Sequence, residues 1–300
     1  MVVAGREGQV ARALAERGPG AGVEVIRLGR PGFDLLRPDD AARAIEAARP
    51  DVVVNAAAFT AVDKAEAEPG LAMQVNADGA AAVAAAAARI GAPLLQLSTD
   101  YVFDGALARP YREDDATAPL NAYGRSKLAG EEAALRACPR AVVVRTAWVY
   151  SPFGANFLKT MLRLGLAQDG VRVVADQCGS PTSALDLADA LIAIAREARR
   201  RPGDRALYGV VHVAAPDFAT WAEFAKAIFQ AAHRLGRRRI AVEPILAKDY
   251  PLPARRPANS RLDAAKLEAV YGHVLPSWRA SVRACVARLV GEAEQGGRSR

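Results

Sequence analysis

The sequence predicts an α/β fold: a doubly wound parallel sheet followed by a smaller, mostly helical C-terminal substrate domain. Three observations lead to this prediction. Short β-branched runs alternate with alanine-rich helical stretches through the first half of the chain. These runs are apolar throughout, as strands covered on both faces of a parallel sheet are. Two glycines follow the first run directly, which is typical of a Rossmann-like dinucleotide-binding turn.

Five strands are expected in the first half, at residues 2–4, 23–28, 52–55, 94–98 and 141–146. The helices between them are expected at residues 8–17, 38–49, 69–90 and 122–137. Because connections between parallel strands are almost always right-handed, elements in this order wind onto both faces of one sheet. We therefore assign residues 1–150 to a dinucleotide-binding domain.

The pattern loosens after residue 150. A loop at 151–156 precedes a helix, a strand at 171–174, a loop at 176–182, a helix at 185–199 and a strand at 208–213. A further helix, a proline-rich segment at 251–257 and two final helices follow, and residues 296–300 are expected to form a frayed tail. We expect residues 151–300 to form the substrate-binding region, with some segments packing back onto the first domain.

Composition argues against several classes of function. The net charge of +7 comes mostly from arginines on predicted helix faces, without interleaved aromatic residues, so no nucleic-acid partner is expected. The longest apolar stretch, residues 77–90, is mostly alanine and too short to span a bilayer. Since no signal peptide is visible either, we expect a cytoplasmic protein with no membrane partner. The three cysteines and three histidines are widely separated, so no metal site is expected.

The turn between the first strand and the first helix is a candidate cofactor site. Gly5 and Gly8 would let the backbone approach a pyrophosphate, and the N–H groups at the start of the helix would point toward it. The spacing G-x-x-G-x-x-A departs from the usual G-x-G-x-x-G. The prediction therefore depends on the strand–turn–helix context of the glycines.

The end of the second strand indicates which dinucleotide binds. A carboxylate there would hydrogen-bond the ribose of NADH, but Leu28 is followed by Gly29 and Arg30, with no carboxylate before Asp34. An arginine at this place favours the 2′-phosphate of NADPH, and Arg6 would assist from the glycine turn. We expect NADPH to be preferred, with NADH as the alternative cofactor.

A tyrosine and a lysine four residues apart indicate carbonyl reduction. Tyr123 and Lys127 would share one helix face, next to the strand end that carries Thr99. Because an ordinary phenol has a pKa of about 10, we expect the Lys127 ammonium to lower the pKa of Tyr123 and to hold the nicotinamide ribose. The Thr99 hydroxyl would share the substrate oxygen and stabilise its developing charge. These three residues are the candidate catalytic group, and their chemistry needs no metal.

Seven segments carry a family resemblance that covers nearly the whole chain: residues 5–10, 55–66, 98–103, 119–131, 145–150, 176–182 and 256–262. In these segments the chain resembles the extended short-chain dehydrogenase/reductases, and within them the dTDP-4-dehydrorhamnose reductase family. The last two segments lie outside the generic cofactor fold, which makes the resemblance more specific.

The resemblance implies roles for individual residues. Thr99, Tyr123 and Lys127 would be catalytic. Tyr101 and Trp148 would pack near the sugar, and Arg256 is the candidate partner of the substrate diphosphate. The cofactor site would be lined by Gly8, Gln9, Val10, Asp34, Leu35, Ala58, Phe59 and Thr60, with Thr60 close to both ligands.

The implied reaction is NADPH-dependent reduction of the C4 keto group of dTDP-4-dehydro-β-L-rhamnose, with Tyr123 as the proton donor. Two alternatives stay open: a reductase of another nucleotide-linked 4-ketohexose, and a non-enzymatic NADP-binding protein similar to the regulatory subunit of methionine adenosyltransferase. Some family members hold magnesium between subunits through glutamates, but the matching position here is Ala13. A homodimer is left open, without a metal.

Overall fold

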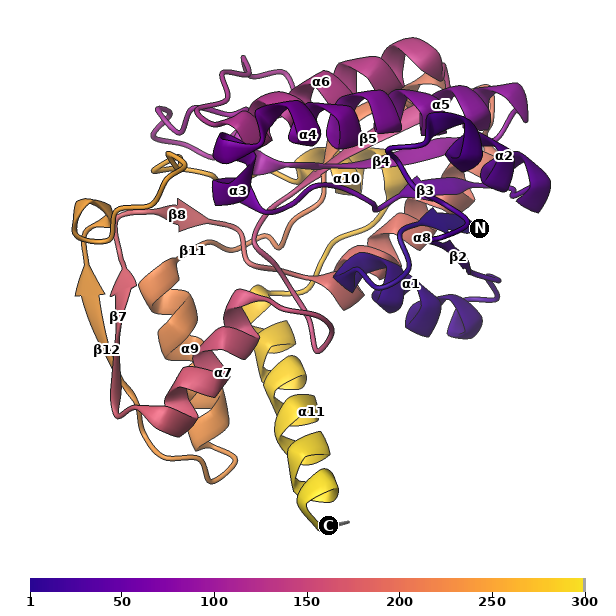
Figure 1. The fold of residues 1–300 in the computed structure, drawn as a ribbon. Helices are drawn as coiled ribbons and strands as arrows, with labels where there is room; N and C mark the ends of the chain where they lie inside the picture. Colours follow the sequence, from indigo (N-terminus) through magenta and orange to yellow (C-terminus); the bar gives the residue numbers. More distant parts are fainter. Residues whose placement is uncertain (299–300) are drawn as a thin grey trace.

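A computed structural model shows how the chain folds (Figure 1). The structure describes residues 1–298, with side chains up to residue 293. A central sheet with helices on both faces forms the larger part, and a second group of helices and short sheets lies to one side of it. Of the tail expected at 296–300, residues 296–298 belong to the last helix, and residues 299–300 lie outside the described part.

The central sheet has six parallel strands in the order β10-β5-β4-β3-β1-β2. They are β1 (Val2–Ala4), β2 (Ile26–Leu28), β3 (Val53–Asn55), β4 (Leu94–Thr99), β5 (Ala141–Thr146) and β10 (Gly209–His212). The chain moves outward from β1 in both directions, which is the winding that a Rossmann-like sheet requires. The predicted fold class is therefore confirmed, although β2 begins later than expected.

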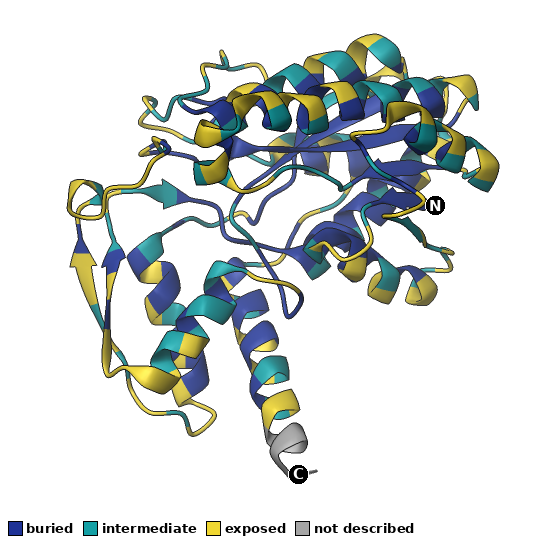
Figure 2. Cartoon of the chain, viewed as in Figure 1, coloured by how far each residue is buried: buried dark blue, intermediate teal, exposed yellow. Residues whose placement is uncertain are grey.

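Helices cover both faces of this sheet. One face packs against α1 (Gln9–Gly20), α8 (Ala184–Arg200) and α10 (Ala265–Tyr271), and the other packs against α2 (Pro38–Ala48), α5 (Gly79–Arg89) and α6 (Ala122–Ala137). Successive strand residues alternate between the two cores, so that Val3 belongs to the first and Val2 to the second. Both cores are apolar, which explains why the strands read as uninterrupted apolar runs; Figure 2 shows them as a buried layer.

The helix expected at 69–90 consists of three sections: α4 (Pro69–Met73), the π-helical turn η1 (Gln74–Asp78) and α5. A short helix that the sequence analysis missed, α3 (Val62–Ala67), precedes them. The π turn lies against α6 at Gly130, where a Cβ atom would come within 2.0 Å of the Asn76 carbonyl oxygen. Single π turns inside α-helices often occur at functional sites.

The second half of the chain contributes to both parts of the molecule. β10 completes the central sheet, and α8 and α10 complete the helical layer that includes α1. The remaining helices, α7 (Phe157–Ala167), α9 (Trp221–His233) and α11 (Trp278–Arg298), share a core of their own around Phe224, Trp278 and Val282. The division into a cofactor part, 1–150, and a substrate part, 151–300, stays a prediction.

Three two-stranded sheets accompany these helices: β7 (Gly170–Val174) with β12 (Ala241–Ile245), β8 (Cys178–Gly179) with β11 (Ala219–Thr220), and β6 (Val149–Tyr150) with β9 (Thr182–Ser183). Short 3₁₀ turns occur at η2 (Asp100–Val102), η3 (Arg205–Leu207) and η4 (Ala247–Asp249). Among the described residues, no helix combines the length and apolar character that a membrane span needs.

Candidate active site

The carboxyl ends of β1, β3 and β4 bring the candidate residues to one edge of the sheet. The glycine turn follows β1, the segment with Ala58 and Phe59 follows β3, and η2 follows β4. Helix α6, which carries Tyr123 and Lys127, begins beside η2. Ligands of open α/β sheets bind at this edge.

The glycine turn leaves room for a ligand backbone contact. Gly5 has φ +112°, a conformation that other residues adopt only with strain. Gly8 is the N-cap of α1, and a Cβ atom there would have no neighbour within 4 Å. The space over the first N–H groups of α1 therefore fits the pyrophosphate of a dinucleotide.

Two predicted residues of the turn point elsewhere with their side chains. Val10 is buried in the core between α1 and α8. The Gln9 side chain joins the loop after β6: its Oε1 accepts hydrogen bonds from Ser151 Oγ (2.7 Å) and Asn156 Nδ2 (3.0 Å), and its Nε2 donates to the Val149 carbonyl (3.3 Å). Only the backbones of Gln9 and Val10 are therefore available to a cofactor.

A cavity of about 400 Å³ extends from Gly5 toward the segments after β2 and β3. Five further predicted cofactor residues line it: Arg30, Asp34, Leu35, Ala58 and Phe59. Its walls combine apolar side chains with cations, which suits the adenosine end of a dinucleotide. Lys64 of α3 also lines this cavity and was not predicted.

Three arginines gather at the end of β2. Arg27 donates from Nη1 to the Arg6 carbonyl (2.7 Å), and the side chain of Arg6 lies over Gly29, whose Cβ position is 2.7 Å from Arg6 Cβ. Arg30 lines the adjoining cavity. No carboxylate of the described residues forms an ion pair with Arg6, Arg27 or Arg30, so the cluster suits a phosphate. Sequence reasoning missed Arg27 because it lies inside a strand.

The three candidate catalytic residues come together as expected. Thr99 ends β4, and its hydroxyl lies beside the Tyr123 phenol. The same hydroxyl accepts from the Tyr101 amide (3.2 Å) and donates to Asp100 Oδ1 (2.9 Å). Lys127 is 5% exposed, and its Nζ donates to the carbonyl of Leu97 (2.7 Å).

The pKa of Tyr123 is raised in this structure, not lowered as expected. Burial raises the pKa of Tyr123 above its usual value, and the neighbouring Thr99 hydroxyl opposes this change. Burial also lowers the pKa of Lys127 to about 8, and the charge of Glu131 opposes that change. The physical reason is the burial of the phenol itself, while the Lys127 ammonium is hydrogen-bonded to the Leu97 carbonyl of β4. Tyr123 therefore stays a neutral phenol near pH 7.

Of the residues expected near the sugar, Tyr101 contacts Tyr123 and Trp148 contacts Trp221. The Tyr101 ring meets the Tyr123 ring edge-on, with centroids 5.9 Å apart. Trp148 has φ +46° and stacks on Trp221 at 3.5 Å between ring centroids. Gly179 accommodates this arrangement, because a Cβ there would lie 2.4 Å from the indole of Trp148. Thr60, also predicted, is exposed just before α3.

Arg256 is already bound within the protein. Its guanidinium forms a bidentate ion pair with Asp63 of α3 (2.8 and 2.7 Å) and donates to the Ala254 carbonyl (2.6 Å). It also lies beside the Tyr101 phenol. Arg256 thus fastens the proline-rich segment to the site, with few donors left for a diphosphate. Sequence reasoning missed Asp63, because its partner lies 193 residues away.

A cavity of about 340 Å³ lies next to Arg256 in the smaller part of the molecule. Its wall includes Trp221, Tyr250 and Leu252, and Arg172 lies at its edge with Arg256. Aromatic and apolar walls with cations beside them suit a nucleotide, whose base stacks and whose phosphates are anionic.

Asn76 of the π turn connects the cofactor side to the catalytic helix. Its amide accepts from the Phe59 N–H (2.8 Å), and donates to the Phe59 carbonyl (3.0 Å) and to Ser126 Oγ (2.9 Å) of α6. Ser126 in turn donates to the carbonyl of Tyr123 (2.8 Å). No sequence motif pointed to Asn76, because the π turn that aims it is invisible in the apolar pattern.

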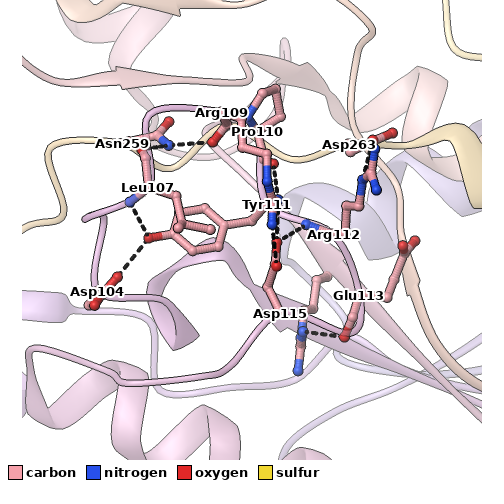
Figure 3. A network of polar contacts seen from close by, with 11 residues as sticks. Asp104, Leu107, Arg109, Pro110, Tyr111, Arg112, Glu113, Asp115, Asn259 and Asp263 are labelled. Carbon is pink, nitrogen blue, oxygen red and sulfur yellow. Dashed lines mark hydrogen bonds and ion pairs between the residues drawn. The ribbon is translucent and has the colours of Figure 1, made fainter.

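The loop between η2 and α6 is held by the segment at 256–262 (Figure 3). Tyr111 donates to Asp104 (2.6 Å), and Arg109 forms a bidentate ion pair with Asp115 (2.6 Å for both bonds). Asn259 donates to the carbonyls of Leu107 (2.7 Å) and Arg109 (2.8 Å). This late segment therefore supports the loop that borders the site.

No group of three or more histidine, cysteine, aspartate or glutamate side chains suited to a metal ion occurs within the described residues.

Comparisons with known proteins agree with this geometry. Residues 1–290 match the family model described as the RmlD substrate binding domain. A dTDP-4-dehydrorhamnose reductase of Sinorhizobium fredii is 48% identical over 295 residues, which cover 98% of this chain and 99% of the relative. A solved dTDP-4-dehydrorhamnose reductase from Clostridium acetobutylicum has a TM-score of 0.88 and 36% identity, covering 96% of this chain and 98% of the other. The Bacillus anthracis enzyme, solved in complex with NADP, has a TM-score of 0.88, 33% identity and the same coverage.

Proposed function

Because the chain belongs to the dTDP-4-dehydrorhamnose reductase family of NAD(P)H-dependent oxidoreductases, we propose that it reduces the C4 keto group of dTDP-4-dehydro-β-L-rhamnose to give dTDP-L-rhamnose. The observation that carries this proposal is the contact of Thr99 with Tyr123 beside the buried Lys127. Proton donors at the carboxyl edge of the sheet, next to a dinucleotide-sized groove, suit carbonyl reduction.

NADPH is the cofactor that the groove favours. The adenosine end would occupy the cavity between Arg30 and Phe59, with the 2′-phosphate near the cluster of Arg6, Arg27 and Arg30. The pyrophosphate would lie over Gly8 at the start of α1. The cofactor supplies a hydride to C4 of the sugar.

Tyr123 would supply the proton. Because burial keeps its phenol protonated at neutral pH, the group can transfer a proton to the carbonyl oxygen as the hydride arrives, and solvent then restores it. Thr99, which lies beside Tyr123, would share the same oxygen and stabilise its negative charge. The Lys127 ammonium would stabilise the phenolate that remains and hold the nicotinamide ribose.

The nucleotide end of the substrate would occupy the cavity beside Arg256. Tyr101, whose ring meets that of Tyr123, and Trp148, which stacks on Trp221 of the cavity wall, would contact the sugar. Thr60 would contact both the cofactor and the sugar. We propose the same division for the chain, with residues 1–150 binding the cofactor and residues 151–300 binding most of the substrate. A cytoplasmic location and a homodimer also stay proposals.

The test is NADPH oxidation with dTDP-4-dehydrorhamnose generated in situ, followed by identification of the sugar. We expect turnover that needs the nucleotide ketosugar, with dTDP-L-rhamnose as product. Faster turnover of another nucleotide-linked 4-ketohexose would change the proposed substrate. Tight NADPH binding without oxidation by any such sugar would contradict the enzymatic proposal and favour a regulatory, non-enzymatic role.

A further inference from the structure

A buried ion pair lies one helical turn from the candidate catalytic lysine. Glu131 of α6 and Arg145 of β5 have side chains 3% and 5% exposed. Arg145 Nη2 lies 2.7 Å from Glu131 Oε2 and its Nε lies 3.0 Å from Oε1, and the Ser98 hydroxyl also donates to Glu131. These bonds fix the carboxylate in position.

The geometry places this carboxylate beside Lys127. Residues four apart share one face of a helix, with Cβ atoms roughly 6 Å apart. The two side chains also reach neighbouring residues of β4, because Lys127 bonds the carbonyl of Leu97 and Glu131 bonds the hydroxyl of Ser98. The strand end that leads into Thr99 thus holds both groups.

The other ionisable groups on elements packed against this part of α6 are differently engaged. Asp100 accepts a hydrogen bond from the Thr99 hydroxyl, and the Glu66 carboxylate accepts one from the Ala122 N–H at the start of α6. The ionisable residues of α6 near Lys127 are Tyr123 and Glu131, and the elements packed against the helix add Arg145 of β5, Asp100 and Tyr101 of η2, Glu66 of α3 and Asp78 of η1, the last two with exposed side chains. Of these, Glu131 is the group whose charge acts on Lys127.

We propose that Glu131 is a positioning residue of the reductase: fixed by Arg145 and Ser98, it keeps the buried Lys127 charged and held against β4. This inference rests on the proposed function only in giving Lys127 a role in turnover. Burial by itself favours the neutral amine, and a neutral amine would neither stabilise a phenolate nor bind a ribose hydroxyl as strongly. The carboxylate opposes that loss.

Glu131 changes the pH at which Lys127 loses its proton. The pKa of Lys127 is lowered to about 8 by burial, and Glu131 raises it. Removing the carboxylate charge should therefore lower the pKa further, so the ammonium is lost at a lower pH. If the pKa falls to about 7, the protonated fraction at pH 8 falls roughly fivefold.

The experiment is a carbon NMR titration of the full chain with isotope-labelled lysine. The chain has six lysines, and Lys127→Met assigns the signal. Glu131→Gln should move the titration of Lys127 to lower pH. The matched control, Arg145→Met, breaks the same ion pair but leaves the carboxylate, so the titration should stay in place or move upward. The double variant removes both charges, leaves no unpaired ion, and should resemble Glu131→Gln if the single variant fails to fold.

The NMR titration reads Lys127 directly, so it tests the inference even if no ketosugar is reduced. With turnover, Glu131→Gln should raise the ratio of NADPH oxidation at pH 6 to that at pH 8 roughly fivefold over wild type. An unchanged Lys127 titration in both Glu131→Gln and the double variant would overturn the proposal. So would an equal downward shift in Arg145→Met, because general damage to the ion pair would then explain the result.

Discussion

Replacing Asn76 by alanine should loosen the cofactor segment and the catalytic helix together. The change removes three hydrogen bonds of 2.8, 3.0 and 2.9 Å, two to the backbone of Phe59 and one to Ser126. Asn76 is 2% exposed, so water does not replace these bonds readily. At roughly 0.5–1.5 kcal/mol for each bond, the free energy of unfolding should fall by about 2–4 kcal/mol.

Two assays separate the effect on stability from the effect on the site. Urea unfolding measures the first, and fluorescence titration with NADPH measures the second, where released Phe59 should weaken binding about tenfold. Gln74→Ala is the matched control, because it changes an exposed residue of the same π turn. If Asn76→Ala unfolds as easily as we expect but binds NADPH like wild type, the coupling through Asn76 is refuted. Equal behaviour of the two variants would refute the energetic argument as well.

The remaining predictions concern the acid, the cofactor and the packing of α6. Tyr123→Phe should lower kcat roughly 10²–10⁴-fold with NADPH binding nearly unchanged, and wild-type turnover would rule out the assigned acid. Arg30→Ala should raise KM for NADPH roughly tenfold and leave KM for NADH unchanged; equal effects on both would contradict the 2′-phosphate contact. Gly130→Ala should cost at least about 1–3 kcal/mol, since its Cβ would overlap the Asn76 carbonyl at 2.0 Å, whereas Gly70→Ala has free space and should cost nothing in an unfolding assay.

The central sheet was predictable because its strands are buried on both faces. Such strands appear as uninterrupted apolar runs, and the alternation with helices then implies the parallel winding. β12 was missed because Glu243 and Pro244 interrupt its apolar pattern and most of it is exposed. The strand exists because it pairs with β7, a contact between distant segments that a local pattern cannot contain.

The site was predictable where spacing along the chain determines geometry. Tyr123 and Lys127 share a helix face, so their neighbourhood could be anticipated. The burial of Tyr123 and of Lys127 depends on tertiary packing and could not, so the expected lowering of the Tyr123 pKa was wrong. The pairing of Arg256 with Asp63 likewise depends on tertiary contacts.

Transfer of deuterium from NADPH to the sugar is the direct test of hydride delivery to C4. The enzyme would be given dTDP-4-dehydrorhamnose and NADPH carrying deuterium at the transferable nicotinamide position, in separate reactions for the two faces of the ring. We expect NMR to show dTDP-L-rhamnose with one deuterium at C4 of the sugar in one of the two reactions. A reduced sugar without deuterium at C4 in either reaction, or no reduced sugar at all, would contradict it.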